Sequence, residues 1–165
     1  MEIPSWDELF IRQVYLSASK SKDPRTKIGS VIVRDRNCVS TGFNGFPIEV
    51  QDLEERYNNR EIKLKLVSHA ESNSILFAAR FGISTLGCKL YTQGIPCNFC
   101  AKQIIQCGIS EIIIHKRWPN LFYSKEWLES FEITNLMFTE ANIKVKEFDK
   151  KLGIKGFLDG KEIEV

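Results

Sequence analysis

Helical and extended segments alternate along residues 69–148, and this alternation limits the fold more than any other feature of the chain. Gly82 stops a helix predicted over His69–Phe81. The segments that follow are, in order, a strand at 88–92, a helix over Asn98–Cys107, a strand at 110–115, a helix near Lys125–Ala141 and a strand at 143–148. Because a helix separates each of these strands from the next, we expect parallel neighbours joined by right-handed crossovers. The almost fully apolar sequence SEIIIH at 110–115 is typical of the centre of a sheet.

The N-terminal part of the chain adds one helix and one hairpin. Ser5 and Glu8 have the spacing of a capping box before an amphipathic helix. The β-branched segment Lys27–Asp35 predicts a strand, and the sequence NCVSTGFNG at 37–45 follows it after a tight turn. We expect these two strands at an antiparallel edge. The predicted fold is therefore α/β, a three-layer α-β-α sandwich with a mixed five-stranded sheet.

Two segments fall outside this pattern. The highly charged stretch Pro47–Val67 predicts a long surface loop, with or without one short helix. Loops of this length are often functional, although a solvated connection is the default. Residues 150–165 are predicted to be a C-terminal tail, an appendage to a single domain over residues 1–149.

Composition limits the classes of function. The 165 residues are 43% hydrophobic and 27% charged, the balance of one soluble globular domain, and the net charge of +2 gives no reason to expect long nucleic acid as a partner. No apolar run approaches a membrane span, and the N-terminus lacks the features of a secretory signal. We therefore expect a cytoplasmic protein (in the host cytoplasm if the source is viral) that binds no membrane. In that reducing compartment, Cys38, Cys88 and Cys107 are expected to be small buried residues.

A histidine and two cysteines have the pattern of a zinc site. His69 and the pair Cys97/Cys100 both fall at predicted helix starts. The two helix N-termini can meet at one edge of the sheet, where open α/β sheets place their ligand sites. Two thiolates and one imidazole form a soft ligand set suited to zinc. Three protein ligands leave the fourth position for a water, whose pKa zinc lowers to about 7.

Glu71 gives this pattern a catalytic meaning. It lies two residues after His69, near the expected metal but outside a ligand position, where its carboxylate could carry a proton. His-x-Glu followed by Pro-Cys-x-x-Cys is the signature of zinc nucleobase deaminases. Alternatives stay open: a lone Cys-x-x-Cys could be a redox pair or half of a structural zinc site. His115 could be a fourth ligand, although a partly exposed loop histidine is the simpler interpretation.

Four blocks of sequence resemble the deoxycytidylate (dCMP) deaminase family of the cytidine deaminase superfamily. They are SKDPRTKIGSVIV, STGFNGFP, HAESNSILFAAR and IPCNFCAKQIIQCGISEIII, in a match that covers about Phe10 to Ile114. The catalytic motif belongs to the whole superfamily, whereas SKDPRTKIG, GFNGFP and CAKQIIQCGI are similar to dCMP deaminases in particular. The resemblance implies a cytidine deaminase-like fold and makes residues 1–149 a zinc-dependent deaminase domain.

The resemblance also implies roles for single residues. Glu71 would be the proton shuttle, and Ala70 would offer its backbone N–H to the pyrimidine carbonyl. Asn44 resembles the family's asparagine that contacts the nucleotide sugar, and a short amide between two glycines could also serve the turn itself. The implied ligands of one zinc per chain are His69, Cys97 and Cys100. The cations that could bind the phosphate are Arg25, Lys27, Lys116 and Arg117.

The implied reaction is the zinc-dependent hydrolysis of dCMP to dUMP and ammonia, which supplies thymidylate synthesis. Pro47–Val67 has no cysteine or histidine for the second zinc of some relatives, so we expect one zinc. Two rival functions stay open. One is deamination of another cytosine nucleotide, of tRNA or of single-stranded DNA. The other is a non-catalytic zinc-binding or effector-sensing subunit, which the intact Glu71 argues against.

The resemblance further implies assembly and regulation. Relatives are often hexamers that dCTP activates and dTTP inhibits, so we expect a homo-oligomer, a hexamer in the first instance. Allosteric dCTP and dTTP effectors, with Mg²⁺ accompanying the nucleotide, are carried over only as an open question. Aromatic residues after the 110–115 strand favour an oligomer because they exceed what one small sheet needs to bury. They are Trp118, Phe122, Tyr123 and Trp127.

Overall fold

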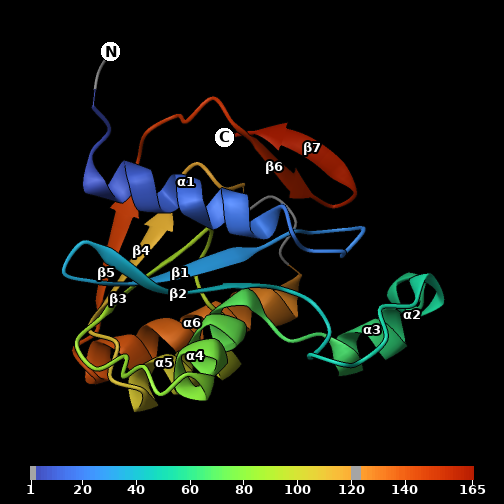
Figure 1. Ribbon diagram of the computed structural model, residues 1–165, viewed down its shortest axis with the longest axis horizontal. Helices are drawn as coiled ribbons and strands as arrows, with labels where there is room; N and C mark the ends of the chain where they lie inside the picture. The colour runs from blue at the N-terminus through green and yellow to red at the C-terminus, as the bar shows by residue number, and fades with distance from the viewer. Residues whose placement is uncertain (1–2, 120–123) are drawn as a thin grey trace.

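A five-stranded sheet forms the middle layer of the molecule. The computed structural model describes residues 3–119 and 124–165, and its sheet has the strand order β2-β1-β3-β4-β5 (Figure 1). β1 pairs antiparallel with β2 and β3, whereas β3, β4 and β5 are parallel. The predicted mixed α/β sheet with an antiparallel edge is therefore confirmed. The strands are β1 (Gly29–Arg34), β2 (Asn37–Phe43), β3 (Lys89–Thr92), β4 (Glu111–His115) and β5 (Lys144–Phe148).

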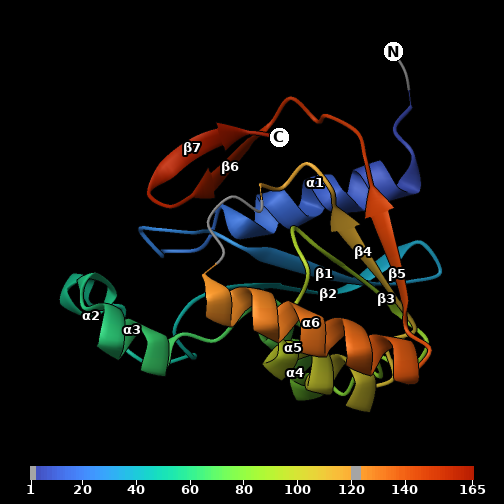
Figure 2. The same cartoon turned by 180° about the vertical axis from the view of Figure 1, so that it is seen from behind.

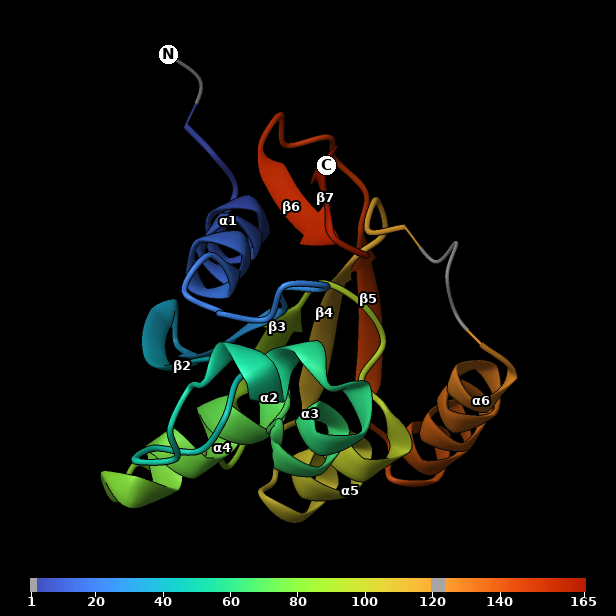
Figure 3. The same ribbon diagram turned by 90° about the vertical axis from the view of Figure 1, so that its right-hand side faces the viewer.

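Helices cover both faces of this sheet. One face carries α1 (Trp6–Ala18), whose N-terminus is capped as expected, with the Glu8 backbone N–H donating to Ser5 Oγ at 3.2 Å. The other face carries α4 (Ala70–Arg80), α5 (Asn98–Gln106) and α6 (Lys125–Glu140), as the view from behind and the side view show (Figure 2, Figure 3). Each face has its own apolar cluster. β4 contributes Ile112 and Ile114 to the α4–α6 side and Ile113 to the α1 side, which explains its apolar sequence.

The charged stretch 47–67 differs from its prediction because it contains two short helices. They are α2 (Glu54–Asn58) and α3 (Arg60–Leu66), which lie to one side of the sheet (Figure 1). Asn59 begins α3 by accepting the Ile62 backbone N–H on its side chain at 3.2 Å. The Tyr57 ring stacks on Phe46, with centroids 4.2 Å apart. Side chains of this segment therefore pack against the domain, which a run of charges does not reveal.

The C-terminal segment also differs from the predicted appendage. Residues 155–164 form a hairpin of β6 (Lys155–Leu158) and β7 (Lys161–Glu164) on the same side of the sheet as α1 (Figure 3). Leu152 and Val165 are buried in the apolar cluster that α1 covers. The Lys27 backbone N–H donates to the Phe157 carbonyl at 3.0 Å. The segment thus packs as part of the folded body, while the domain boundary at residue 149 stays a prediction.

His115 is a buried residue, so its interpretation as a partly exposed loop histidine was wrong. It is the last residue of β4 and only 1% exposed. Its Nε2–H donates to the Lys150 carbonyl at 3.0 Å, and its Nδ1 accepts from the Tyr15 hydroxyl at 2.7 Å. Both ring nitrogens therefore have hydrogen-bond partners on the α1 side of the sheet. Burial also lowers the pKa of the imidazole.

Two further expectations can be compared with the described residues. Cys88 is buried as expected, but Cys38 is exposed and Cys107 is only partly buried. Across residues 3–119 and 124–165, none of the helices has the length and apolar character needed to cross a membrane.

Candidate metal centre and active site

The predicted zinc ligands converge at two helix starts. His69 is the N-cap of α4, and Cys97 is the N-cap of α5, whose first turn contains Cys100. Gly42 permits a close approach of β2 to α4, because a Cβ there would lie 2.3 Å from the Ala70 carbonyl oxygen. On the other side, the Asn98 backbone N–H at the start of α5 donates to Ser130 Oγ of α6 at 2.9 Å. Neighbouring elements thus fix both helix starts.

The three ligand atoms have spacings that fit zinc. Cys97 Sγ and Cys100 Sγ lie 3.3 and 3.5 Å from His69 Nδ1, and all three atoms lie within 4.8 Å of one another. Zinc bonds of about 2.3 Å to sulfur and about 2.0 Å to nitrogen would separate these atoms by about 3.5 Å in a tetrahedral site. Within the part of the chain that is described, this is the one group of three metal-ligating side chains. A zinc here would have three protein ligands and one open position.

The electrostatics favour a thiolate at Cys97. The Cys100 thiol, with further help from His69, lowers the pKa of Cys97 to about 4. The hydrogen bonds with Cys97 raise the pKa of His69 and of Cys100, so these two groups would each release a proton when zinc binds. The N-terminus of α5 adds partial positive charge beside the sulfur. A thiolate already stable without the metal is a suitable ligand, since zinc binds the deprotonated form.

Glu71 lies beside this centre without belonging to the ligand set. It is in the first turn of α4 and only 6% exposed. Its Oε1 accepts from Thr92 Oγ1 at 3.3 Å, and its Oε2 lies 3.8 Å from Cys100 Sγ. Burial raises the pKa of the carboxyl above its ordinary value, which favours a group that can both accept and return a proton.

A cavity of about 500 Å³ opens over the metal centre. Its floor includes His69, Glu71 and Cys97. Its walls come from the turn at residues 23–28, from α3, from the 118–119 segment and from the hairpin β6–β7. Small-molecule sites in proteins are clefts of about 300–1,000 Å³. This cavity therefore suits a ligand of the size of a nucleotide.

Comparison with known proteins identifies the family. The family model "Cytidine and deoxycytidylate deaminase zinc-binding region" matches residues 4–116. The chain belongs to this family. The match includes all three converging ligands and Glu71, so the metal centre of this deaminase lies in the region that defines the family.

Individual relatives and structures agree with this assignment. The deaminase is 37% identical over 143 residues to the "Uncharacterized deaminase in luxG 3'region" of Aliivibrio fischeri, covering 87% of this chain and 93% of that protein. It is 35% identical over 154 residues to human deoxycytidylate deaminase, covering 88% and 81%. The dCMP deaminase of cyanophage S-TIM5, solved in complex with dCMP and dUMP, has a TM-score of 0.66 and 21% identity, covering 90% and 100%. This last likeness confirms the cytidine deaminase-like fold.

The structure brings some predicted substrate residues of the deaminase to the cavity and leaves others away from it. Asn44, Ala70 and Arg25 are among its lining residues. Lys27 and Arg117 do not line the cavity. The Lys27 ammonium lies over the Phe157 ring, 5.4 Å from its centroid, and Arg117 Nε donates to Asp149 Oδ1 at 2.6 Å. Among the aromatic residues predicted for an interface, Trp118 is buried and lines the cavity, Trp127 is 40% exposed, and Phe122 and Tyr123 lie outside the described residues.

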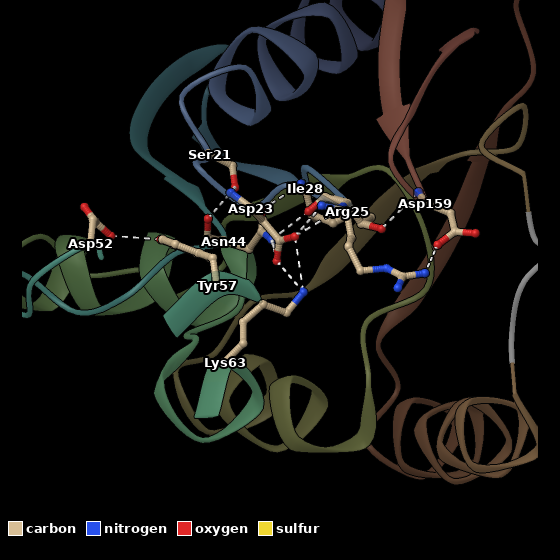
Figure 4. Close-up of polar contacts among 10 residues, drawn as sticks. Ser21, Asp23, Arg25, Ile28, Asn44, Asp52, Tyr57, Lys63 and Asp159 are labelled. Carbon is tan, nitrogen blue, oxygen red and sulfur yellow. Dashed lines mark hydrogen bonds and ion pairs between the residues drawn. The ribbon is translucent and has the colours of Figure 1, made fainter. Parts of the chain in front are cut away.

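A buried ion pair behind Asn44 was missed by sequence reasoning. Lys63 Nζ of α3 donates to both carboxylate oxygens of Asp23, at 3.2 and 3.0 Å, and the two side chains are 10% and 5% exposed (Figure 4). Asp23 Oδ1 also accepts the backbone N–H groups of Arg25 and Thr26, at 2.8 and 3.2 Å. Asn44 completes the arrangement, since its Nδ2 donates to the Thr26 carbonyl at 2.9 Å and its Oδ1 accepts the Ile28 N–H at 2.8 Å.

This geometry shows a structural role for Asn44, while its contact with the nucleotide sugar stays a prediction. Its amide organises the turn before β1, and the residue also lines the cavity. Lys63 supports the same turn from the stretch 47–67, so that stretch is more than a solvated connection. In the sequence, Lys63 lies in a short segment where apolar and charged residues alternate. This pattern is too weak to single out Lys63 as a buried cation.

Replacement of Lys63 by methionine should destabilise the deaminase and impair substrate binding. The change leaves the Asp23 carboxylate buried without its cation, a defect that costs about 3–5 kcal/mol. We expect a lower free energy of unfolding in urea and a raised KM, because the turn that holds Arg25 and Asn44 loses its anchor. The matched control is Lys65→Met on the same helix, which breaks only an exposed pair with Glu61 worth about 0.3–0.5 kcal/mol. Equal losses in the two variants would contradict this role of Lys63.

Proposed function

We propose that the chain hydrolyses dCMP to dUMP and ammonia, with one zinc per chain bound by His69, Cys97 and Cys100. The observation that carries the proposal is a buried carboxylate, Glu71, beside three convergent metal-ligating side chains, with Glu71, His69 and Cys97 lining a nucleotide-sized cavity. The name of the human relative and the dCMP and dUMP bound in the cyanophage structure support deoxycytidylate as the substrate.

When bound, zinc supplies Lewis acidity and lowers the pKa of a water at its open position to about 7. The chain supplies the proton transfers. Glu71 takes a proton from the water as its oxygen adds to C4 of the pyrimidine, and gives it to N3. It then takes the second proton of the added water and passes it to the amino group, which leaves as ammonia as the C4 carbonyl forms. One carboxyl acting in turn as base and acid benefits from a raised pKa, and burial shifts the pKa of Glu71 in that direction.

Substrate binding is proposed for three residues of the cavity wall. The backbone N–H of Ala70, at the first turn of α4, would donate to the pyrimidine carbonyl. Asn44 would contact the sugar. Arg25, which lines the cavity, would bind the phosphate, and a guanidinium suits that group because it can donate two parallel hydrogen bonds. Lys27 and Arg117 do not line the cavity, which makes them weaker candidates.

Ammonia release from a panel of substrates tests this function. The panel comprises dCMP, CMP, deoxycytidine, dCTP and a tRNA, each offered to the zinc-loaded protein. We expect the highest kcat/KM for dCMP and conversion to dUMP in a one-to-one ratio with ammonia. Release from tRNA with none from dCMP would replace this proposal with an editing function.

Assembly, regulation and metabolic role are further proposals. Exposed apolar side chains on α6, including Trp127, Leu128 and Leu136, favour association of copies into a homo-oligomer, and the family resemblance favours a hexamer. The supply of dUMP to thymidylate synthesis and control by dCTP and dTTP, with Mg²⁺ bound to the effector, rest on the resemblance alone. A cytoplasmic location stays a prediction from the sequence.

A further inference from the structure

Two cations line the cavity, and each is paired with a carboxylate. Among the described lining residues these cations are Lys63 and Arg25. Lys63 pairs with Asp23, whereas Arg25 pairs with Asp159 through its Nη2 and the Asp159 Oδ1 (Figure 4). An anionic group that enters the cavity therefore meets cations that are already neutralised, and it must displace one of the two carboxylates to gain a full ion pair.

The two pairs differ in how easily they can be exchanged. Lys63 and Asp23 are almost fully buried, and Asp23 also accepts two backbone N–H groups. Breaking such a pair leaves an uncompensated buried charge, which is strongly unfavourable. Arg25 and Asp159 are 62% and 41% exposed. Exposed ion pairs contribute little to stability because water solvates both partners after separation. The exchangeable cation is therefore Arg25.

The C-terminal hairpin places Asp159 at this point. Asp159 and Gly160 form the turn between β6 and β7, both with positive φ, which matches the preference of two-residue hairpin turns for Asp-Gly. The Gly160 N–H donates to the Arg25 carbonyl at 2.7 Å, and the Asp159 N–H donates to Thr26 Oγ1 at 3.4 Å. The hairpin is thus fastened to the segment that carries Arg25. The carboxylate is held where it faces the guanidinium, and Asp159 itself lines the cavity.

We propose that Asp159 is a specificity-determining residue that competes with the anionic group of the substrate for the Arg25 guanidinium. A phosphate carries about −1.5 to −2 charges and accepts two parallel bonds from arginine, so it displaces the single carboxylate. A ligand without an anionic group leaves the pair intact and gains nothing from Arg25. The identity of the anion as a nucleotide phosphate rests on the proposed function.

The test compares Asp159→Asn with a matched variant of the same hairpin. Glu162→Gln removes the same charge, but Glu162 pairs with Lys155 and does not line the cavity. Asp159→Asn removes the carboxylate that competes for Arg25, so it should lower the KM for dCMP. The expected change is up to about fivefold, which is the effect on affinity of losing one exposed ion pair. The ratio of kcat/KM for dCMP to that for deoxycytidine should rise by the same factor. Glu162→Gln should leave this ratio unchanged, and in an Arg25→Gln background the effect of Asp159→Asn should disappear.

Binding of inorganic phosphate, measured by calorimetry on the zinc-loaded variants, separates this inference from the proposed function. If the wild-type protein does not turn over dCMP, the proposed function fails, and phosphate binding still tests Asp159. Tighter phosphate binding by Asp159→Asn than by wild type, lost with Arg25→Gln, supports competition. An unchanged or weaker affinity for phosphate, an unchanged or higher KM for dCMP, or an equal effect of Glu162→Gln would overturn it.

Discussion

Replacement of Glu71 by glutamine should lower the turnover of dCMP by at least about 10²–10⁴-fold, the range typical of a lost general acid–base. Glutamine keeps the size of the side chain and can still accept the Thr92 hydroxyl on its amide oxygen. It cannot carry a proton. Zinc content should stay at about one per chain, because Glu71 is not a ligand, and dUMP should still bind. Turnover per zinc-loaded chain and metal content, measured on one preparation, check this result.

The matched control for that experiment is Glu126→Gln. Glu126 lies in the first turn of α6, is exposed and does not line the cavity. It reports the effect of losing an exposed carboxylate at a helix N-terminus, without a catalytic role. If Glu71→Gln resembled Glu126→Gln, with a small loss of stability and near wild-type turnover, Glu71 would be a structural carboxylate and the mechanism would be wrong.

Replacement of Cys97 by alanine should remove the metal. Two of the three ligand atoms remain, and a catalytic zinc site requires three. We expect zinc content close to zero after dialysis, no measurable deamination and a lower melting temperature than that of the zinc-loaded wild type, since metal bound to the native state stabilises it. Metal analysis and a thermal melt provide the measurements.

Cys107→Ala is the control for Cys97→Ala. Cys107 lies at the opposite end of α5 and is only partly buried, so its loss should leave zinc content unchanged. Stoichiometric zinc in the Cys97→Ala protein would exclude Cys97 as a ligand. Two zinc ions per wild-type chain would equally contradict the account of a single open site.

Local patterns explain why the centre of the site was predictable from sequence. His69 and Cys97 are helix N-caps, and the signals for a helix start lie within a few residues of each. Glu71 and Cys100 follow in the first turns, at spacings that the helix itself imposes. The parallel pairing of β3, β4 and β5 followed from crossover rules in the same way, because β4 is apolar on both faces and each crossover contains one helix.

Long-range contacts explain what was not predictable. Lys63 is separated from Asp23 by 40 positions and Arg25 from Asp159 by 134, and a lysine or aspartate in a charged stretch is usually solvated. His115 is the last residue of β4, and its hydrogen-bond partners are Tyr15 of α1 and Lys150, which follows β5. Its burial therefore depends on segments far from it in the sequence. The hairpin had a local signal in the sequence, because Asp159-Gly160 lies between two short β-compatible segments. This dipeptide is typical of a two-residue β-hairpin turn and predicts a hairpin rather than an appendage.

If the chain is a zinc-dependent deaminase, its formation of dUMP requires bound zinc. The protein is stripped with a chelator and titrated with zinc, while dUMP formed from dCMP is measured beside bound zinc per chain. We expect no turnover in the stripped protein and a rate that rises in proportion to zinc and stops rising at about one zinc per chain. Full turnover in the stripped protein, or none with one zinc bound, would contradict this expectation.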